Sequence, residues 1–171
     1  MQNDEGFAPK ETMAQISELK ASDIPERGIR KETLDKFGVK VAVSQEDGKT
    51  PEAVYFPSYN QKGKVVGYTK QNLTKSKEEK GHWSCVGSVT IGNKMFGQNV
   101  AEAQNRKRNN LVITEGQWDC LSVFQALVDN VKGTKYEGIE PLVVSIPMGT
   151  ANAVESILHN ENYVTSHDAL T

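Results

Sequence analysis

The sequence predicts an α/β fold, in which an α+β amino-terminal lobe is followed by a βαβ unit with parallel strands. An apolar run over 111–113 breaks at Thr-Glu-Gly (114–116), and apolar residues then recur at helical spacing. A second apolar run over 142–146 supplies another buried strand. A turn-rich segment over 60–63 separates two extended stretches and indicates a hairpin. A strand, a helix and a strand in this order favour a right-handed parallel crossover.

The first residues of the chain, 1–22, are mostly polar. They carry one modest helical stripe, formed by Met13, Ile16 and Leu19. We therefore expect an arm or linker that can dock on a neighbouring element.

The amino-terminal lobe is predicted to cover residues 23–105. Residues 23–37 favour a short helix, because a glycine follows directly after them, and 39–43 favour a strand. The hairpin strands are expected over 54–59 and 64–70. Together these elements make a small α+β unit.

The second part, 106–171, is predicted to hold the parallel strands. The helix between them is marked by apolar residues at Leu121, Phe124, Leu127 and Val128. After the second strand, Ile157 and Leu158 suit a short helix, and a polar tail follows to Thr171. This part therefore contains one βαβ unit and the start of another helix.

Composition describes a globular chain of 171 residues, 37% hydrophobic and 25% charged, which can bury one core. No run of 18 apolar residues and no signal peptide are present, so we expect a cytoplasmic protein with no membrane partner. Cys85 and Cys120 are too few and too far apart for a zinc ribbon. The sequence therefore predicts reduced thiols and no zinc.

The net charge of −2 argues against a uniformly basic nucleic-acid binder, but the lysines are clustered. One stretch contains Lys62, Lys64, Lys70, Lys75, Lys77 and Lys80. A basic face is one interpretation of this stretch, and a solvated loop partly neutralised by Glu78 and Glu79 is the other. A second basic stretch over 106–108 favours a solvated turn over a DNA contact.

Glu115 is the strongest candidate site residue, because it follows a buried strand at an abrupt turn. The carboxyl ends of strands in open α/β sheets form the usual ligand crevice. Asp119 lies about one helical turn later and can approach the same site. An acid in a first helical turn is also favoured by the helix dipole, whatever the protein does. Trp118 beside them is predicted to be partly buried against a neighbouring helix rather than stacked on a base.

The apolar run, Thr-Glu-Gly, two residues and Asp119 together resemble the first motif of the TOPRIM domain, which DNA primases, type IA and type II topoisomerases and some nucleases share. Three further segments resemble, in order, the primase half of phage-type primase-helicases. They are FPSYNQKGKVVGYTKQ at 56–71, KMFGQNV at 94–100 and PLVVSIPMGTANAV at 141–154. The resemblance covers roughly residues 23–154.

This resemblance implies roles for particular residues. Glu115 is expected to be catalytic, and Glu115 and Asp119 to bind Mg²⁺ or Mn²⁺ weakly, since Mg²⁺ takes one or two carboxylates together with substrate phosphates. Lys70 matches a lysine that faces these acids, and is expected to be catalytic and to bind nucleotide or DNA. The family's second lysine matches either Lys75 or Lys77, and nucleotide or DNA contacts are expected at these lysines and at Gly116. The residues themselves, apart from the resemblance, suggest one more contact at Gly149. One interpretation of the turn at Gly149 is a site where a phosphate approaches backbone N–H groups, and the other is a simple strand-to-helix loop.

The activity that the resemblance implies is that of a DNA primase. Such an enzyme synthesises short RNA primers on single-stranded DNA from ribonucleoside triphosphates, with a replicative helicase fused or associated. The family's next motif, Asp-x-Asp, occurs nowhere in this sequence. We therefore expect residues 106–171 to form a partial TOPRIM domain, in a fragment that is weakly active or inactive.

Two other functions fit the same residues. One is a non-catalytic TOPRIM-derived module that binds a replication or host protein. The other is a TOPRIM nuclease or topoisomerase fragment. A topoisomerase needs a nucleophilic tyrosine, and neither Tyr136 nor Tyr163 has a recognisable context for that role.

Overall fold

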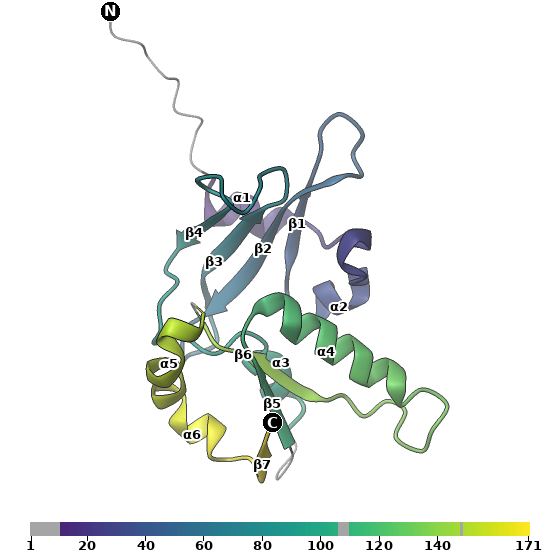
Figure 1. The fold of residues 1–171 in the computed structure, drawn as a ribbon, viewed down its shortest axis with the longest axis vertical. Coiled ribbons are helices and arrows are strands. Elements are labelled where there is room, and N and C mark those ends of the chain that lie inside the picture. The colour runs from purple at the N-terminus through teal and green to yellow at the C-terminus, as the bar shows by residue number, and fades with distance from the viewer. Residues whose placement is uncertain (1–10, 106–109, 148) are drawn as a thin grey trace, which may run out of the picture.

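The computed structural model describes residues 11–105, 110–147 and 149–171, so the basic stretch over 106–108 lies outside the described residues. Figure 1 shows an upper part built on a four-stranded sheet and a lower part built on a parallel sheet with helices on either side. The mixed α/β class predicted from the sequence is confirmed. Over the described ranges, no helix combines the length and hydropathy needed to cross a bilayer.

The elements follow one another in an α+β order and then a β/α order. The helical segments are α1 (Met13–Glu18), η1 (Pro25–Arg27), α2 (Lys31–Lys36), α3 (Gln98–Ala103), α4 (Gln117–Asn130), η2 (Thr150–Asn152), α5 (Ala153–His159) and α6 (Glu161–Val164). The strands are β1 (Lys40–Val43), β2 (Pro51–Tyr59), β3 (Val65–Asn72), β4 (Trp83–Gly87), β5 (Asn110–Thr114), β6 (Leu142–Ser145) and β7 (Ala169–Leu170).

The first sheet is antiparallel, in the order β1-β2-β3-β4. Successive side chains of a strand point to opposite faces, so the sheet divides its residues between two clusters. Tyr55 and Tyr68 pack with Ile16 of α1 on one face, which we call the α1 face. Val54 and Phe56 point the other way into the main core, on what we call the core face. The predicted arm thus includes a helix that docks on the sheet.

The predicted helix over 23–37 is wrong in extent, because the segment forms two short helical pieces. Pro25 begins η1, where its missing N–H costs nothing. Gly28 ends η1 in the left-handed conformation with φ 64°. Ile24 and Ile29 then pair across this turn as an antiparallel bridge. The remaining helix, α2, begins after this turn.

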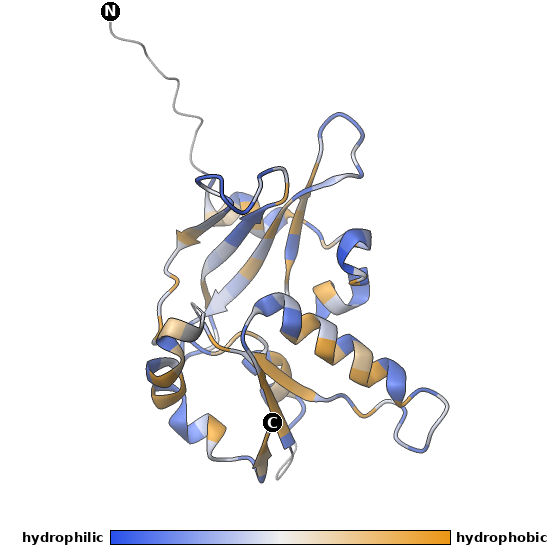
Figure 2. Ribbon diagram, in the orientation of Figure 1, coloured by the Kyte–Doolittle hydropathy of each residue, from blue (hydrophilic) through white to orange (hydrophobic). Residues whose placement is uncertain are grey.

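The parallel sheet has the order β6-β5-β7. β5 and β6 pair in parallel, and Figure 2 shows both as mostly hydrophobic strands. α4 packs against β6 through Cys120, Leu121 and Phe124, which confirms the predicted βαβ unit. The core that contains these side chains also includes residues of the first sheet, so apolar packing joins the two parts.

Four of the elements were not predicted from the sequence. β4 is an edge strand whose residues are largely exposed, so it shows no apolar alternation. α3 is a six-residue helix that follows the left-handed Gly97. The polar tail contains two elements that its composition did not indicate, α6 and β7, and Ala169 and Leu170 of β7 pair in parallel with β5. Both residues of β7 are exposed, so no apolar run marked this strand.

Both cysteines are free, as predicted, since Cys85 is exposed and Cys120 is buried. Burial raises the pKa of the Cys120 thiol, which keeps it protonated and unreactive. It contributes to the packing beneath α4.

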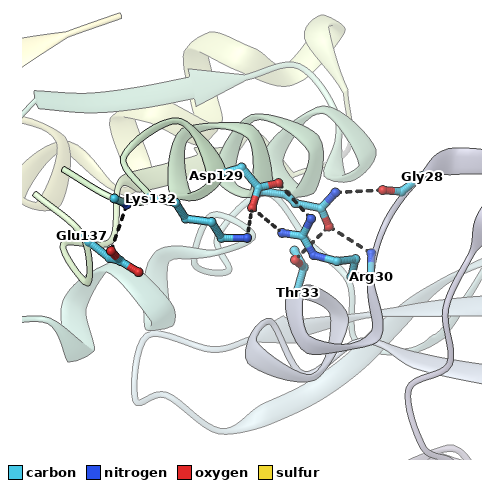
Figure 3. A network of polar contacts seen from close by, with 8 residues as sticks. Gly28, Arg30, Thr33, Asp129, Lys132 and Glu137 are labelled. Carbon is cyan, nitrogen blue, oxygen red and sulfur yellow. Dashed lines mark hydrogen bonds and ion pairs between the residues drawn. The ribbon is translucent and has the colours of Figure 1, made fainter.

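A polar network fastens α4 to the segment around α2 (Figure 3). The side chain of Gln125 donates to the carbonyl of Gly28 over 2.8 Å and accepts from the backbone N–H of Arg30 over 2.9 Å. It also accepts from the Thr33 hydroxyl over 3.0 Å. The Arg30 guanidinium donates twice to the Asp129 carboxylate, over 2.8 and 2.9 Å. The amino-terminal end of α2 is therefore fixed against α4.

The Asp129 end of this network is expected to lose its contribution to stability in acid. Hydrogen bonds from Arg30 and Lys132 lower the pKa of Asp129 from its usual 3.8 to about 2. A carboxyl with a lowered folded-state pKa stabilises the fold above its unfolded pKa, and loses that contribution as the pH falls through the folded value. Asp129→Asn should therefore lower stability slightly at neutral pH, and the difference from wild type should shrink between about pH 4 and about pH 2.

Urea unfolding of wild type and Asp129→Asn at a series of pH values measures this difference. Glu46→Gln is a matched control, since Glu46 is exposed in the β1–β2 turn. A difference that stays constant across the acid range would show that the ion pair does not carry the effect.

Candidate functional site

The turn between β5 and α4 presents two carboxylates to solvent. Glu115 follows the last residue of β5 and is exposed, as predicted. Gly116 caps α4 in an extended conformation. Asp119 lies in the first turn of α4, and its Oδ2 is 3.3 Å from the position that a Cβ on Gly116 would occupy. The structure therefore brings the two acids to the same turn.

Thr114 holds this turn against the neighbouring strand. Its hydroxyl lies 3.2 Å from the carbonyl oxygen of Gly116 and 3.2 Å from that of Val144 in β6. A hydroxyl has one proton, so the two carbonyls share a single donor. This contact fixes the carboxyl ends of β5 and β6 relative to each other, on either side of Glu115.

A narrow cleft with a cavity volume of about 20 Å³ lies between this edge of the parallel sheet and the core face of the first sheet. Its walls come from both parts of the chain. It is lined by Phe56, Pro57, Ser58, Thr69, Val89, Lys94, Phe96, Gln117 and Pro147. Because Gln117 begins α4 and Pro147 follows β6, the cleft opens beside the turn that carries Glu115.

Trp118 joins the two walls. Its indole nitrogen donates to Gln71 Oε1 in β3 over 2.6 Å. Its ring meets Phe56 edge to face at a centroid distance of 5.1 Å, and the guanidinium of Arg27 lies 5.1 Å from the ring centroid. The ring is partly buried, as predicted, but the predicted helix partner is wrong, because the ring packs against β2 and β3 of the first sheet. Trp118 thus holds the first turn of α4 on the core face.

The structure does not bring Lys70 and Glu115 together. Lys70 Nζ lies 2.7 Å from Glu11 Oε1 and 5.4 Å from the centroid of the Tyr55 ring, on the α1 face. Its neighbour Gln71 points to the core face instead. The sequence pattern located the strand, but strand alternation decides the face, and a shift of one residue reverses it. The catalytic and binding roles of Lys70 remain predictions.

The other predicted lysines lie in the loop between β3 and β4. Lys75 Nζ donates to the carbonyl of Lys80 over 2.9 Å, and Lys77 is exposed. A hydrogen bond from the Ser76 backbone lowers the pKa of the Glu79 carboxyl, which stays charged beside these lysines. The loop is thus ordered by its own contacts while it remains open to solvent.

Gly149, the second predicted phosphate-binding glycine, follows β6. It has φ 77°, and no atom lies within 4 Å of the position that a Cβ would occupy. The backbone there is open to a ligand, and the left-handed conformation favours glycine.

Glu115 and Asp119 are the hard oxygen donors of this site. Among residues 11–105, 110–147 and 149–171, no group of three or more His, Cys, Asp or Glu residues could hold a metal ion. Two exposed carboxylates suit Mg²⁺ only where substrate phosphates complete its shell. The residues present therefore fit a weak magnesium site that needs substrate.

Gln71 and Thr69 were missed by sequence reasoning. Both lie on β3 at alternate positions around Lys70, so they share the core face, with Gln71 bonded to Trp118 and Thr69 lining the cleft. The alternation of side chains along the hairpin strands could have indicated the core face of β3. Phe56 pairs with Thr69 and belongs to the apolar core, so Thr69 and Gln71 lie on the same face as Phe56.

The sequence matches no protein-family model and no curated protein. The structure does match solved ones. The primase fragment of the bacteriophage T7 primase-helicase protein is 21% identical, with a TM-score of 0.66 over 96% of this chain and 59% of that chain. A T7 structure with primase domains of two gp4 subunits is 24% identical, with a TM-score of 0.60 over 88% of this chain and 64% of that chain.

The catalytic core of E. coli primase is 16% identical, with a TM-score of 0.56 over 85% of this chain and 51% of that chain. At these identities the likeness is one of fold. The chain has the fold of primase catalytic cores, of the kind found in the T7 primase fragment. It spans less than two thirds of the length of these relatives.

Proposed function

We propose that this chain is the catalytic part of a DNA primase, which makes short RNA primers on single-stranded DNA from ribonucleoside triphosphates. One observation carries the proposal. The primase-core fold extends over 96% of the chain, and Glu115 stands in it at the carboxyl end of a parallel strand, beside the cleft between the two sheets.

In the proposed reaction, the 3′ hydroxyl of the primer attacks the α-phosphate of the incoming ribonucleotide, and pyrophosphate leaves. Glu115 and Asp119 would hold Mg²⁺ or Mn²⁺, which when bound would neutralise charge on the transferring phosphate. In this proposal Glu115 takes the proton of the attacking hydroxyl. Gly116 at the amino end of α4 and Gly149 offer backbone approaches for phosphate oxygens.

The proposed partners are single-stranded DNA, ribonucleoside triphosphates and a replicative helicase, in the cytoplasm of the host cell if the gene is carried by a phage. The DnaG catalytic domain has been solved bound to single-stranded DNA. The T7 primase domains have been solved with an RNA/DNA hybrid, dTTP and the lagging-strand DNA polymerase.

Incorporation of labelled ribonucleotides on single-stranded DNA of random sequence tests the proposal. The assay is run with this chain and with the full-length product of its gene, in Mg²⁺ and in Mn²⁺. Products of two or more nucleotides that depend on template and metal are expected from the full-length product. Absence of such products from both proteins, while both are folded, would contradict the proposal.

A non-catalytic binding module is the second candidate. It is favoured by the presence of only two carboxylates at the turn, without a third metal-ligating group beside them in the described part of the chain. Binding of single-stranded DNA or of a replication protein without any synthesis by the full-length product would favour it. Of the two tyrosines considered for a topoisomerase, Tyr163 is poorly suited, because it is half-buried and burial raises the pKa of its hydroxyl, whereas Tyr136 is exposed.

Loss of one loop lysine should weaken the binding of single-stranded DNA. Lys77 is exposed, so Lys77→Ala is expected to lower affinity and to reduce the slope of log affinity against log salt by about 1, as for one lost phosphate contact. Fluorescence anisotropy of a labelled oligothymidine at several salt concentrations measures both quantities.

Lys70→Ala is the informative comparison. Its ion pair with Glu11 on the α1 face predicts little change in DNA affinity, whereas the match to the family's lysine predicts a loss similar to that of Lys77→Ala. An equal loss in both variants would assign Lys70 to the site. If neither variant loses DNA affinity, the lysines of the loop are only solvated and do not bind DNA.

A further inference from the structure

A chain of hydrogen bonds connects the first turn of α4 to the lysine loop, which we define as residues 73–82. Trp118 Nε1 donates to Gln71 Oε1 over 2.6 Å. Gln71 Nε2 lies 3.0 Å from Nε2 of His82, and Nδ1 of His82 lies 2.8 Å from the carbonyl oxygen of Lys75. The chain therefore runs from the turn beside Glu115, across β3, to the backbone of the loop.

These bonds can have only one polarity. An indole N–H donates and cannot accept, so the oxygen of the Gln71 amide must face Trp118. The amide NH₂ then faces Nε2 of His82, which must accept and so carries no proton. The backbone carbonyl of Lys75 requires a donor, so the His82 proton sits on Nδ1. Each hydrogen bond in the chain therefore determines the orientation or the proton position of the next group.

Burial leaves few substitutes for these partners. Gln71 is 2% exposed and His82 is 7% exposed, so water does not readily replace a missing bond. The loop is also closed at its base, where the Asn72 N–H donates to the His82 carbonyl over 2.8 Å. The loop thus has a defined anchor at His82 and a defined distance from α4.

We propose that Gln71 and His82 are positioning residues, which hold the lysine loop at a fixed place relative to the Glu115 turn. The lysines carry charge toward the ligand, and the hydrogen-bond chain determines where that charge lies. The use of this loop for DNA or nucleotide rests on the proposed primase function. The positioning itself rests only on the bonds from Trp118 to Lys75.

Gln71→Leu keeps a similar volume but breaks both bonds of the amide. We expect amide hydrogen exchange in residues 73–81 to become faster by about tenfold or more, because the buried nitrogen of His82 loses its donor. Affinity for oligothymidine should fall in parallel. Gln45→Leu, in the exposed β1–β2 turn, is the matched control and should change neither.

Gln71→Glu tests the polarity. A carboxylate still accepts from Trp118 but has no N–H for His82, so the bond between them re-forms only when His82 carries protons on both ring nitrogens. The charged groups that interact with His82 are Glu78 and Glu79 of the loop, and neither is altered. Loop protection in Gln71→Glu should approach that of wild type when the His82 ring carries both protons, and fall to that of Gln71→Leu when it carries only one.

The ¹⁵N resonances of the His82 ring show directly which of its two nitrogens carries a proton. Wild type should show a protonated Nδ1 and an unprotonated Nε2, and Gln71→Glu should show two protonated nitrogens in acid. Circular dichroism confirms that each variant is folded. The proposal is overturned if the wild-type ring is protonated on Nε2, or if Gln71→Leu leaves loop exchange unchanged, or if Gln71→Glu behaves like Gln71→Leu even when the ring carries both protons.

The two readouts separate this inference from the proposed function. Faster loop exchange with unchanged DNA affinity would confirm the positioning and remove the loop lysines from DNA binding. Unchanged exchange with lowered affinity would overturn the positioning, because the affinity would then depend on Gln71 by another route.

Discussion

Replacement of Glu115 by glutamine is expected to reduce primer synthesis by about 100-fold or more, the usual contribution of a general acid or base. The amide keeps the size of the side chain but removes the negative charge, so it does not accept the proton and holds a divalent cation more weakly. Because Glu115 is exposed at the turn, the fold should not depend on it. The thermal midpoint of the variant is therefore expected to equal that of wild type.

Ribonucleotide incorporation by the full-length product measures the catalytic loss. Binding of Mn²⁺, followed by electron paramagnetic resonance in the presence of a ribonucleoside triphosphate, gives a second measurement that this chain alone can supply. Asp119→Asn should weaken Mn²⁺ binding as well, while Glu46→Gln in the β1–β2 turn should leave it unchanged. Full synthesis by Glu115→Gln would remove Glu115 from the catalytic role.

The parallel unit could be predicted from sequence because its signals are local. A buried strand shows as an apolar run, and the switch to helical spacing after Gly116 places α4 without any tertiary information. Glu115 could be predicted for the same reason, since its position depends only on where β5 ends. A few consecutive residues are enough to predict each of these features.

Other features depend on contacts between distant segments. The face on which Lys70 lies is decided by the pairing of β3 with β2, in which Lys70 stands opposite Tyr55. The hydrogen bond from Trp118 to Gln71 joins residues 47 positions apart, and no pattern within one segment predicts it. β7 consists only of Ala169 and Leu170, which form a strand because they pair with the edge of β5. Sequence periodicity cannot specify such pairings.

Gly97 is another feature that the sequence alone could not explain, because the reason for it lies in packing. Its sequence context, KMFGQNV, matched the family pattern, but the physical reason for a glycine there appears only when distant segments meet. The residue has φ 85°, a left-handed conformation that disfavours any side chain. A Cβ would lie 2.6 Å from the Val143 carbonyl oxygen of β6 and 2.8 Å from Cε1 of Phe37. The backbone before α3 therefore passes through a space that only glycine fits.

Gly97→Ala is accordingly expected to destabilise the fold strongly. The left-handed conformation alone costs about 1–2 kcal/mol for a residue with a Cβ. The clash with a strand carbonyl and a buried ring adds about 1–3 kcal/mol, the usual cost of overpacking. Urea unfolding should show a fall in the free energy of unfolding of about 2–5 kcal/mol, the sum of these two contributions.

Gly138→Ala separates the two contributions. Gly138 has φ 84°, nearly the value of Gly97, but no atom lies within 4 Å of the position of its Cβ. This variant should therefore lose only the conformational part, about 1–2 kcal/mol. The difference between the two variants measures how tightly the segment before α3 is packed between β6 and α2. Equal losses would mean that β6 and Phe37 move aside at little cost, and that the two parts of the chain are joined less rigidly than their shared core indicates.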